Sequence, residues 1–175
     1  MRVVAGIHKG RRLVAPPGRD TRPTSDRVRE ALFQILGSLE GERVLDLFAG
    51  SGALAIEALS RGAASAVLVE RDPRAVAAIR RNLEPLGADA EVRRMDALLF
   101  LRTYEGEPFS LVFVDPPYSS APRLARELTE RLPRVTTDDA RIVTESDKRT
   151  PLELGLPLVA ERSWGDTRIA IHRGR

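Results

Sequence analysis

The sequence of 175 residues contains no cysteine. This absence excludes disulfide bonds, thiolate nucleophiles and cysteine metal sites, and it suits an intracellular protein. His8 and His172 are the only histidines, so we expect no metal site. No apolar run approaches the length of a membrane-spanning helix, and no charged-then-apolar leader is visible. We therefore expect a cytoplasmic protein that does not contact a membrane.

Lysine is also scarce, because Lys9 and Lys148 are the only lysines among 28 basic residues. The charge is unevenly spread: residues 1–29 hold eight basic and two acidic residues, a net charge of +6, whereas the whole chain carries +3. A basic segment on a mildly acidic body is typical of a protein that binds a polyanion, and arginine grips phosphate with paired hydrogen bonds. RNA or DNA is the expected partner, and a solvated basic surface is the alternative.

The order of apolar patterns indicates one domain with a small appendage. Residues 1–14 alternate loosely around Gly6 and Gly10 and predict a short β-hairpin; a helix is predicted from the N-cap Ser25. Strand and helix patterns then alternate, which predicts parallel pairing with right-handed crossovers, closed by an antiparallel hairpin at Gly165-Asp166. Strands are expected at 43–48, 66–70, 91–95, 111–114, 141–145, 158–162 and 167–172, and helices at 53–60, 73–86, 97–102 and 122–132.

These patterns predict an α/β fold class: a doubly wound, mostly parallel seven-stranded sheet, Rossmann-like, with an N-terminal hairpin and helix. We expect residues 1–40 to form the basic appendage and residues 41–175 to form the ligand-binding body.

The most informative motif is Asp115-Pro116-Pro117-Tyr118, which directly follows an apolar run. Such a run ending in an acid is typical of a buried parallel strand, and open α/β sheets bind ligands at the carboxyl ends of their strands. Two prolines stiffen the loop and remove two main-chain donors, so its carbonyls can accept hydrogen bonds from a ligand. An acid, outward carbonyls and an aromatic ring suit a nucleobase with an exocyclic amine. The alternative is a surface turn.

A second motif follows the first strand of the body, where Gly50 and Gly52 permit a tight turn close to a ligand. Its spacing satisfies a dinucleotide fingerprint, and Glu70 lies where a ribose-binding acid belongs. A nicotinamide enzyme is therefore one reading of the motif. Asp46 opposes it, because a carboxylate in the strand would repel a pyrophosphate but attract the sulfonium and ammonium groups of S-adenosylmethionine.

Asp96 follows the third strand and is placed to face the adenine amino group of that cofactor. The alternative for each of these acids is a helix cap favoured by the helix dipole. The expected cofactor site comprises Asp46, Phe48, Ala49, Gly50, Ser51, Gly52, Glu70, Arg71, Asp96 and Ala97.

The body of the chain resembles class I S-adenosylmethionine-dependent methyltransferases. Nearly its full length resembles the bacterial enzymes that methylate the exocyclic N2 of a guanine in 16S ribosomal RNA. The resemblance rests on residues 22–24, 26–33, 45–54, 57–61 and 112–118. The glycine loop is shared by many methyltransferases, and Asp-Pro-Pro-Tyr by several that act on amino groups, including those of DNA adenine. The Arg-Pro-Thr segment at 22–24 is the discriminating one, and some relatives carry phenylalanine at the position of Tyr118.

The resemblance implies methyl transfer from S-adenosylmethionine, with S-adenosylhomocysteine as product, to a guanine of 16S ribosomal RNA or the small ribosomal subunit. Asp115 and the Pro116 carbonyl would accept the N–H bonds of the amine while Tyr118 stacks on the base; whether Asp115 also takes the proton stays open. RNA contacts are expected from Lys9, Arg11, Arg12, Arg22, Thr24, Arg27 and Arg29. We expect a monomer. Adenine-N6 methylation of nucleic acid and a non-catalytic RNA-binding assembly factor are the alternatives.

Overall fold

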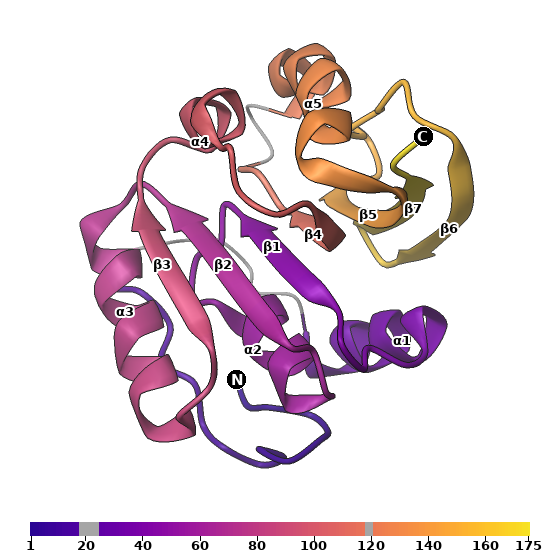
Figure 1. Ribbon diagram of the computed structural model, residues 1–175. Coiled ribbons are helices and arrows are strands. Elements are labelled where there is room, and N and C mark those ends of the chain that lie inside the picture. The colour runs from indigo at the N-terminus through magenta and orange to yellow at the C-terminus, as the bar shows by residue number, and fades with distance from the viewer. Residues whose placement is uncertain (18–24, 118–120) are drawn as a thin grey trace.

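The computed structural model describes residues 1–17, 25–117 and 121–175. Its centre is a seven-stranded sheet in the order β3-β2-β1-β4-β5-β7-β6 (Figure 1). The strands are β1 (Arg43–Leu47), β2 (Ser65–Glu70), β3 (Ala90–Arg94), β4 (Phe109–Val114), β5 (Thr136–Asp147), β6 (Leu158–Trp164) and β7 (Thr167–Arg173).

The pairing of these strands confirms the predicted fold class. β1 lies parallel to β2 and β4, and the outer pairs β2–β3 and β4–β5 are parallel as well. β7 runs antiparallel to both β5 and β6, so the predicted hairpin closes the sheet. The chain proceeds outward from β1 to β3 and then returns to place β4 on the other side of β1. The strand order therefore reverses between β1 and β4, and such a switch point is where doubly wound sheets bind ligands.

Helices cover both faces of the sheet (Figure 1). They are α1 (Asp26–Leu36), α2 (Ala53–Ser60), α3 (Pro73–Leu83), the 3-10 turn η1 (Glu84–Leu86), α4 (Ala97–Thr103) and α5 (Ala121–Val135). α1, α2 and α3 share one apolar cluster with the sheet, and α4 and α5 share another on the opposite face. Among the described ranges, no helix combines the length and apolar character that crossing a membrane requires.

Local sequence explains where α1 and α3 begin. Ser25 caps α1, because its Oγ accepts a hydrogen bond of 3.3 Å from the main-chain N–H of Val28. Asp72 caps α3 and Pro73 takes its first position, where the missing N–H costs nothing. α3 ends earlier than the predicted residue 86, because Pro85 lacks the N–H that would continue the α-helical hydrogen bonds and the chain tightens into η1.

The predicted N-terminal hairpin is reduced to one antiparallel bridge, between Arg2 and Arg12. Main-chain hydrogen bonds from Val3 N–H to the Arg11 oxygen and from Gly10 N–H to the Val3 oxygen, both 2.9 Å, hold the two arms together. α1, by contrast, is part of the main core, since the Phe33 ring lies 5.7 Å from the Phe113 ring. The proposed division at residue 40 stays a prediction.

Candidate active site

The two predicted motifs leave the sheet side by side. In the parallel pairing of β1 with β4, Asp46 lies opposite Phe113 and Leu47 opposite Val114. Phe48 and Asp115 are therefore the first residues beyond two neighbouring strands, at the same carboxyl edge. Asp115 is half-buried, Pro116 is buried and Pro117 is exposed, whereas Tyr118 lies outside the described residues. The Asp115 corner (residues 115–117) and the glycine loop (residues 48–52) thus border one site at the switch point.

The glycine loop is a tight left-handed turn. Gly50 and Gly52 have φ angles of +58° and +77°, and Phe48 adopts +63° although it is not glycine. Because side chains rarely adopt this conformation, Phe48 marks a constrained backbone of the kind found at ligand sites. A Cβ atom on Gly52 would lie 2.9 Å from Cδ2 of Leu68 in β2. The loop therefore needs glycine at residue 52 for both its φ angle and its close approach to the sheet.

Glu70 orders this loop from the end of β2. Its buried carboxylate accepts 2.9 Å hydrogen bonds from the main-chain N–H of Gly50, through Oε2, and of Asp72, through Oε1. Glu70 thus ties the loop after β1 to the loop after β2. A contact between Glu70 and a ribose stays a prediction, as does one from Arg71, which is exposed beside it.

Asp46 lies beneath the first turn of α2, where it is buried. Its Oδ2 accepts a 3.2 Å hydrogen bond from the main-chain N–H of Ala55. Burial raises the pKa of Asp46 to about 7; the bond from Ala55 opposes this shift and the nearby Glu70 adds to it. The carboxylate occupies a helix N-terminal N–H that a pyrophosphate would use. Two buried carboxylates under the loop suit a cationic ligand such as S-adenosylmethionine and disfavour a dinucleotide.

Asp96 adopts the role that the sequence offered as an alternative. It is the N-cap of α4, and its Oδ1 accepts hydrogen bonds from the N–H groups of Leu98 and Leu99 at 2.9 and 3.1 Å. Its side chain remains exposed while Ala97 is buried. Capping and a contact with an adenine are compatible, and the second stays a prediction.

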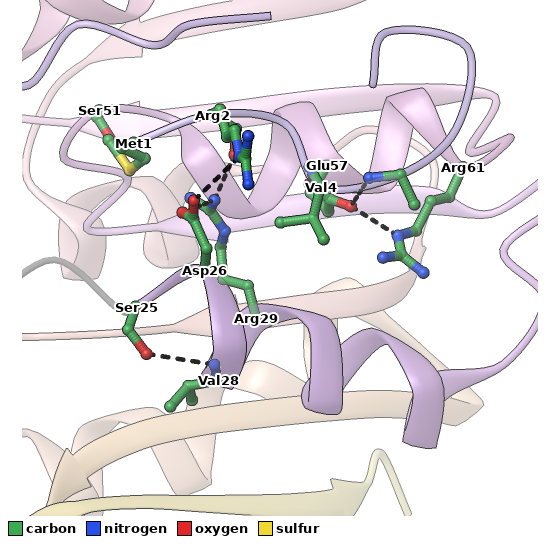
Figure 2. A network of polar contacts seen from close by, with 11 residues as sticks. Met1, Arg2, Val4, Ser25, Asp26, Val28, Arg29, Ser51, Glu57 and Arg61 are labelled. Carbon is green, nitrogen blue, oxygen red and sulfur yellow. Dashed lines mark hydrogen bonds and ion pairs between the residues drawn. The ribbon is translucent and has the colours of Figure 1, made fainter. Parts of the chain in front are cut away.

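The predicted RNA-binding residues fall into three groups. Lys9, Arg11, Arg12 and Arg27 are exposed, and Arg22 and Thr24 lie outside the described residues. The structure contradicts the predicted RNA contact of Arg29, because its side chain is only 1% exposed and pairs with Asp26 at 2.7 Å (Figure 2). Its Nη2 also donates to the main-chain oxygen of Arg2. Arg29 is thus wrongly predicted to contact RNA; it fastens the N-terminal segment to α1.

Two buried polar side chains that the sequence reasoning missed attach the hairpin to the body. Glu57 accepts hydrogen bonds from the N–H groups of Val4 and Ala5 at 2.7 and 3.0 Å and pairs with Arg61 (Figure 2). Asn82 does the same for the second arm, because its amide accepts from Val14 N–H at 2.8 Å and donates to the Val14 oxygen at 3.0 Å. A polar residue within the apolar stripe of a helix was the available signal for both.

Comparison with known proteins gives the family. Residues 1–173 match the family described as Conserved hypothetical protein 95. The chain belongs to this family. It is 41% identical over 163 residues to Ribosomal RNA small subunit methyltransferase D of Escherichia coli strain K12. The matched residues cover 91% of this chain and 79% of that protein. It is 38% identical over 183 residues to a Bacillus subtilis strain 168 protein named "Putative rRNA methyltransferase YlbH", with 100% of both covered.

Solved structures agree with this family and its fold. The structure of a hypothetical protein of Thermus thermophilus is 32% identical, with a TM-score of 0.86 over 99% of each chain. The structure of an Escherichia coli protein named "Putative methyltransferase yhhF" is 35% identical with a TM-score of 0.83, over 99% of this chain and 97% of that one. The sheet described above is therefore that of the class I methyltransferases.

Proposed function

We propose that this protein transfers the methyl group of S-adenosylmethionine to the exocyclic N2 amine of a guanine in 16S ribosomal RNA. The observation that carries the proposal is the pairing of β1 with β4, which sets the glycine loop beside the Asp115 corner. The name of the Escherichia coli relative, a small-subunit ribosomal RNA methyltransferase, supports the substrate class. S-adenosylhomocysteine is the product.

The cofactor-binding residues are those whose chemistry suits a cation carrying adenosine. Asp46 and Glu70 supply negative charge beneath the loop, and Gly50 and Gly52 let the main chain approach. When bound, the cofactor supplies a methyl group already activated by a positive sulfur. The residues of this chain therefore have to hold that methyl group and the acceptor amine in line, which is catalysis by positioning.

The Asp115 corner holds the acceptor. An aromatic amine is a poor nucleophile, because its lone pair is delocalised into the ring. The Asp115 carboxylate and the Pro116 carbonyl each accept a hydrogen bond from one N–H group of the amine. These hydrogen bonds favour a pyramidal nitrogen whose lone pair points at the methyl group. Neither Pro116 nor Pro117 brings a competing main-chain donor. The base must first leave its stack, at a cost of a few kcal/mol.

The exposed cations of the N-terminal segment hold the RNA. Lys9, Arg11, Arg12 and Arg27 offer positive charge to phosphates, and Glu57 and Asn82 fix the segment that carries Lys9, Arg11 and Arg12. The affinity they supply is sequence-independent, so the choice of guanine comes from the shape of the folded RNA. We further propose that the protein acts in the cytoplasm as a monomer.

The experiment that tests this function is transfer from a donor with a labelled methyl group to 16S ribosomal RNA, free and in small subunits, followed by mass spectrometry of the nucleosides. N2-methylguanosine is the expected product. N6-methyladenosine would overturn the choice of base. Binding of RNA without any transfer to either substrate would favour the non-catalytic assembly factor. Equilibrium dialysis with NAD and S-adenosylmethionine separates the two cofactor readings.

A further inference from the structure

The outer surface of α3 carries unbalanced positive charge. Arg74, Arg80 and Arg81 are all exposed, and the helix contains no acidic residue. None of these three guanidinium groups forms an ion pair in the part of the chain that the structure describes. On α5, by contrast, the exposed Arg126 pairs with Glu130 at 3.0 Å and the partly buried Arg131 pairs with Glu127 at 2.8 Å. The cations of α3 are therefore available to a partner.

Helix stability explains only part of this surface. Arg80 and Arg81 lie in the last turn of α3, where the helix dipole favours positive charge. Arg74 lies in the first turn, where the dipole disfavours it. The position of Arg74 thus has no stabilising role within the helix, which points to a role outside it.

Arg74 and Arg81 share one face of α3. They are seven residues apart, which is close to two helical turns and about 10 Å along the axis. Only the small side chain of Ala77, which is exposed, lies between them on this surface. Two cations on one unobstructed face can each contact a phosphate of the same nucleic-acid strand.

The α3 surface is continuous with the basic hairpin. Asn82, next to Arg81, holds the main chain of Val14 at both its N–H and its oxygen. Leu13 packs in the same apolar cluster as Leu86, just after α3. The exposed Arg12 directly precedes these contacts. Figure 1 shows the N-terminal segment running beside α3, so the two basic segments are neighbours.

We propose that Arg74 and Arg81 form a second row of phosphate contacts that extends the RNA-binding surface from the hairpin along α3. This inference rests on the proposed function. α3 begins directly after the carboxyl end of β2, so Arg74 lies at the sheet edge that carries the active site. The RNA backbone therefore crosses α3 between the hairpin and the edge where its base reacts.

The test measures the affinity of the full-length protein for a 16S ribosomal RNA transcript over a series of salt concentrations. Arg74→Gln and the double variant Arg74→Gln/Arg81→Gln are compared with the wild type. We expect the slope of log affinity against log salt to become shallower by about one for each lost phosphate contact. Arg102→Gln is the matched control, because Arg102 is exposed in the last turn of α4, on the opposite face, and its loss should leave the slope unchanged.

Three results would overturn the inference: an unchanged slope in the double variant, an equal loss in Arg102→Gln, or a loss seen only with assembled subunits, which would assign α3 to a ribosomal protein. S-adenosylhomocysteine affinity should stay constant in all variants. Labelled-methyl transfer measured in parallel separates the two proposals. If the wild type methylates RNA but the double variant keeps the wild-type salt slope, only this inference is refuted. If the wild type methylates no RNA, the proposed function is refuted.

Discussion

Nδ2 of Asn82 donates a 2.9 Å hydrogen bond to the main-chain oxygen of Ser51 in the glycine loop. The same buried amide exchanges two hydrogen bonds with the main chain of Val14. One side chain therefore joins the loop proposed to bind the cofactor to the arm proposed to bind RNA. Because Asn82 is only 4% exposed, it acts through its neighbours rather than on either ligand.

Asn82→Ala should weaken the binding of both S-adenosylhomocysteine and RNA. The substitution removes three hydrogen bonds, all of them partly buried, each worth about 0.5–1.5 kcal/mol. We expect the dissociation constant for S-adenosylhomocysteine and the KM for RNA each to rise about 10-fold, measured by calorimetry and steady-state kinetics. Gln34→Ala, at an exposed position of α1, is the control. A change in only one constant would refute the joint role of Asn82.

Asp115→Ala should remove methyl transfer and spare cofactor binding. Asp115 follows β4, whereas the carboxylates beneath the glycine loop come from β1 and β2. Loss of a preorganised acceptor for the amine should lower kcat at least about 100-fold. Asp115→Asn separates charge from shape, and the exposed Asp89→Ala serves as control. If S-adenosylhomocysteine binding falls along with the rate, Asp115 belongs to the cofactor site instead.

Most of the sheet could be predicted because continuous apolar runs record strands that are buried on both faces. The run ending at Asp115 and the run containing Asp46 both became central parallel strands, and chain order alone indicated their shared edge. The start of β5 was missed, since residues 136–139 are polar. There the pairing with β4 shifts between Phe109 and Leu111, an irregularity that no sequence period reports.

The predicted site was less complete, because charge counts do not reveal burial. Arg29 contributed to the basic count of the N-terminal segment, yet it points inward to Asp26 one turn earlier. The contacts of Glu57 and Asn82 could not be predicted from the sequence, because their partners are main-chain groups of a distant segment. Contacts between a side chain and remote backbone leave no mark on local composition.

Gly52→Ala should cost more stability than Gly41→Ala. Both glycines have nearly the same positive φ, +77° and +76°, so both substitutions carry a similar backbone strain of about 1–2 kcal/mol. Only at Gly52 does the added Cβ meet another atom, Cδ2 of Leu68 at 2.9 Å, which adds about 1–3 kcal/mol of overpacking. Urea unfolding measures both free energies. Equal losses would show that the contact with Leu68 is relaxed without cost.

The buried Asp46 should make the stability of the protein depend on pH. Burial raises its pKa from 3.8 to about 7, so between these values the folded protein holds a proton that the unfolded chain releases. The free energy of unfolding should therefore fall as pH rises through this window, and Asp46→Asn should remove that fall.

S-adenosylmethionine is a cation and favours the ionised carboxylate, so its binding should expel the proton from Asp46. Its affinity should then rise with pH up to the pKa of about 7, by at most about tenfold per unit, and level off above it. Titration calorimetry in buffers of different ionisation enthalpy counts the released proton directly. Asp46→Asn should bind more weakly and show no such slope. A wild-type affinity that is flat over the same range would mean that Asp46 is already ionised before the cofactor arrives, and that its burial is compensated by the hydrogen bond from Ala55.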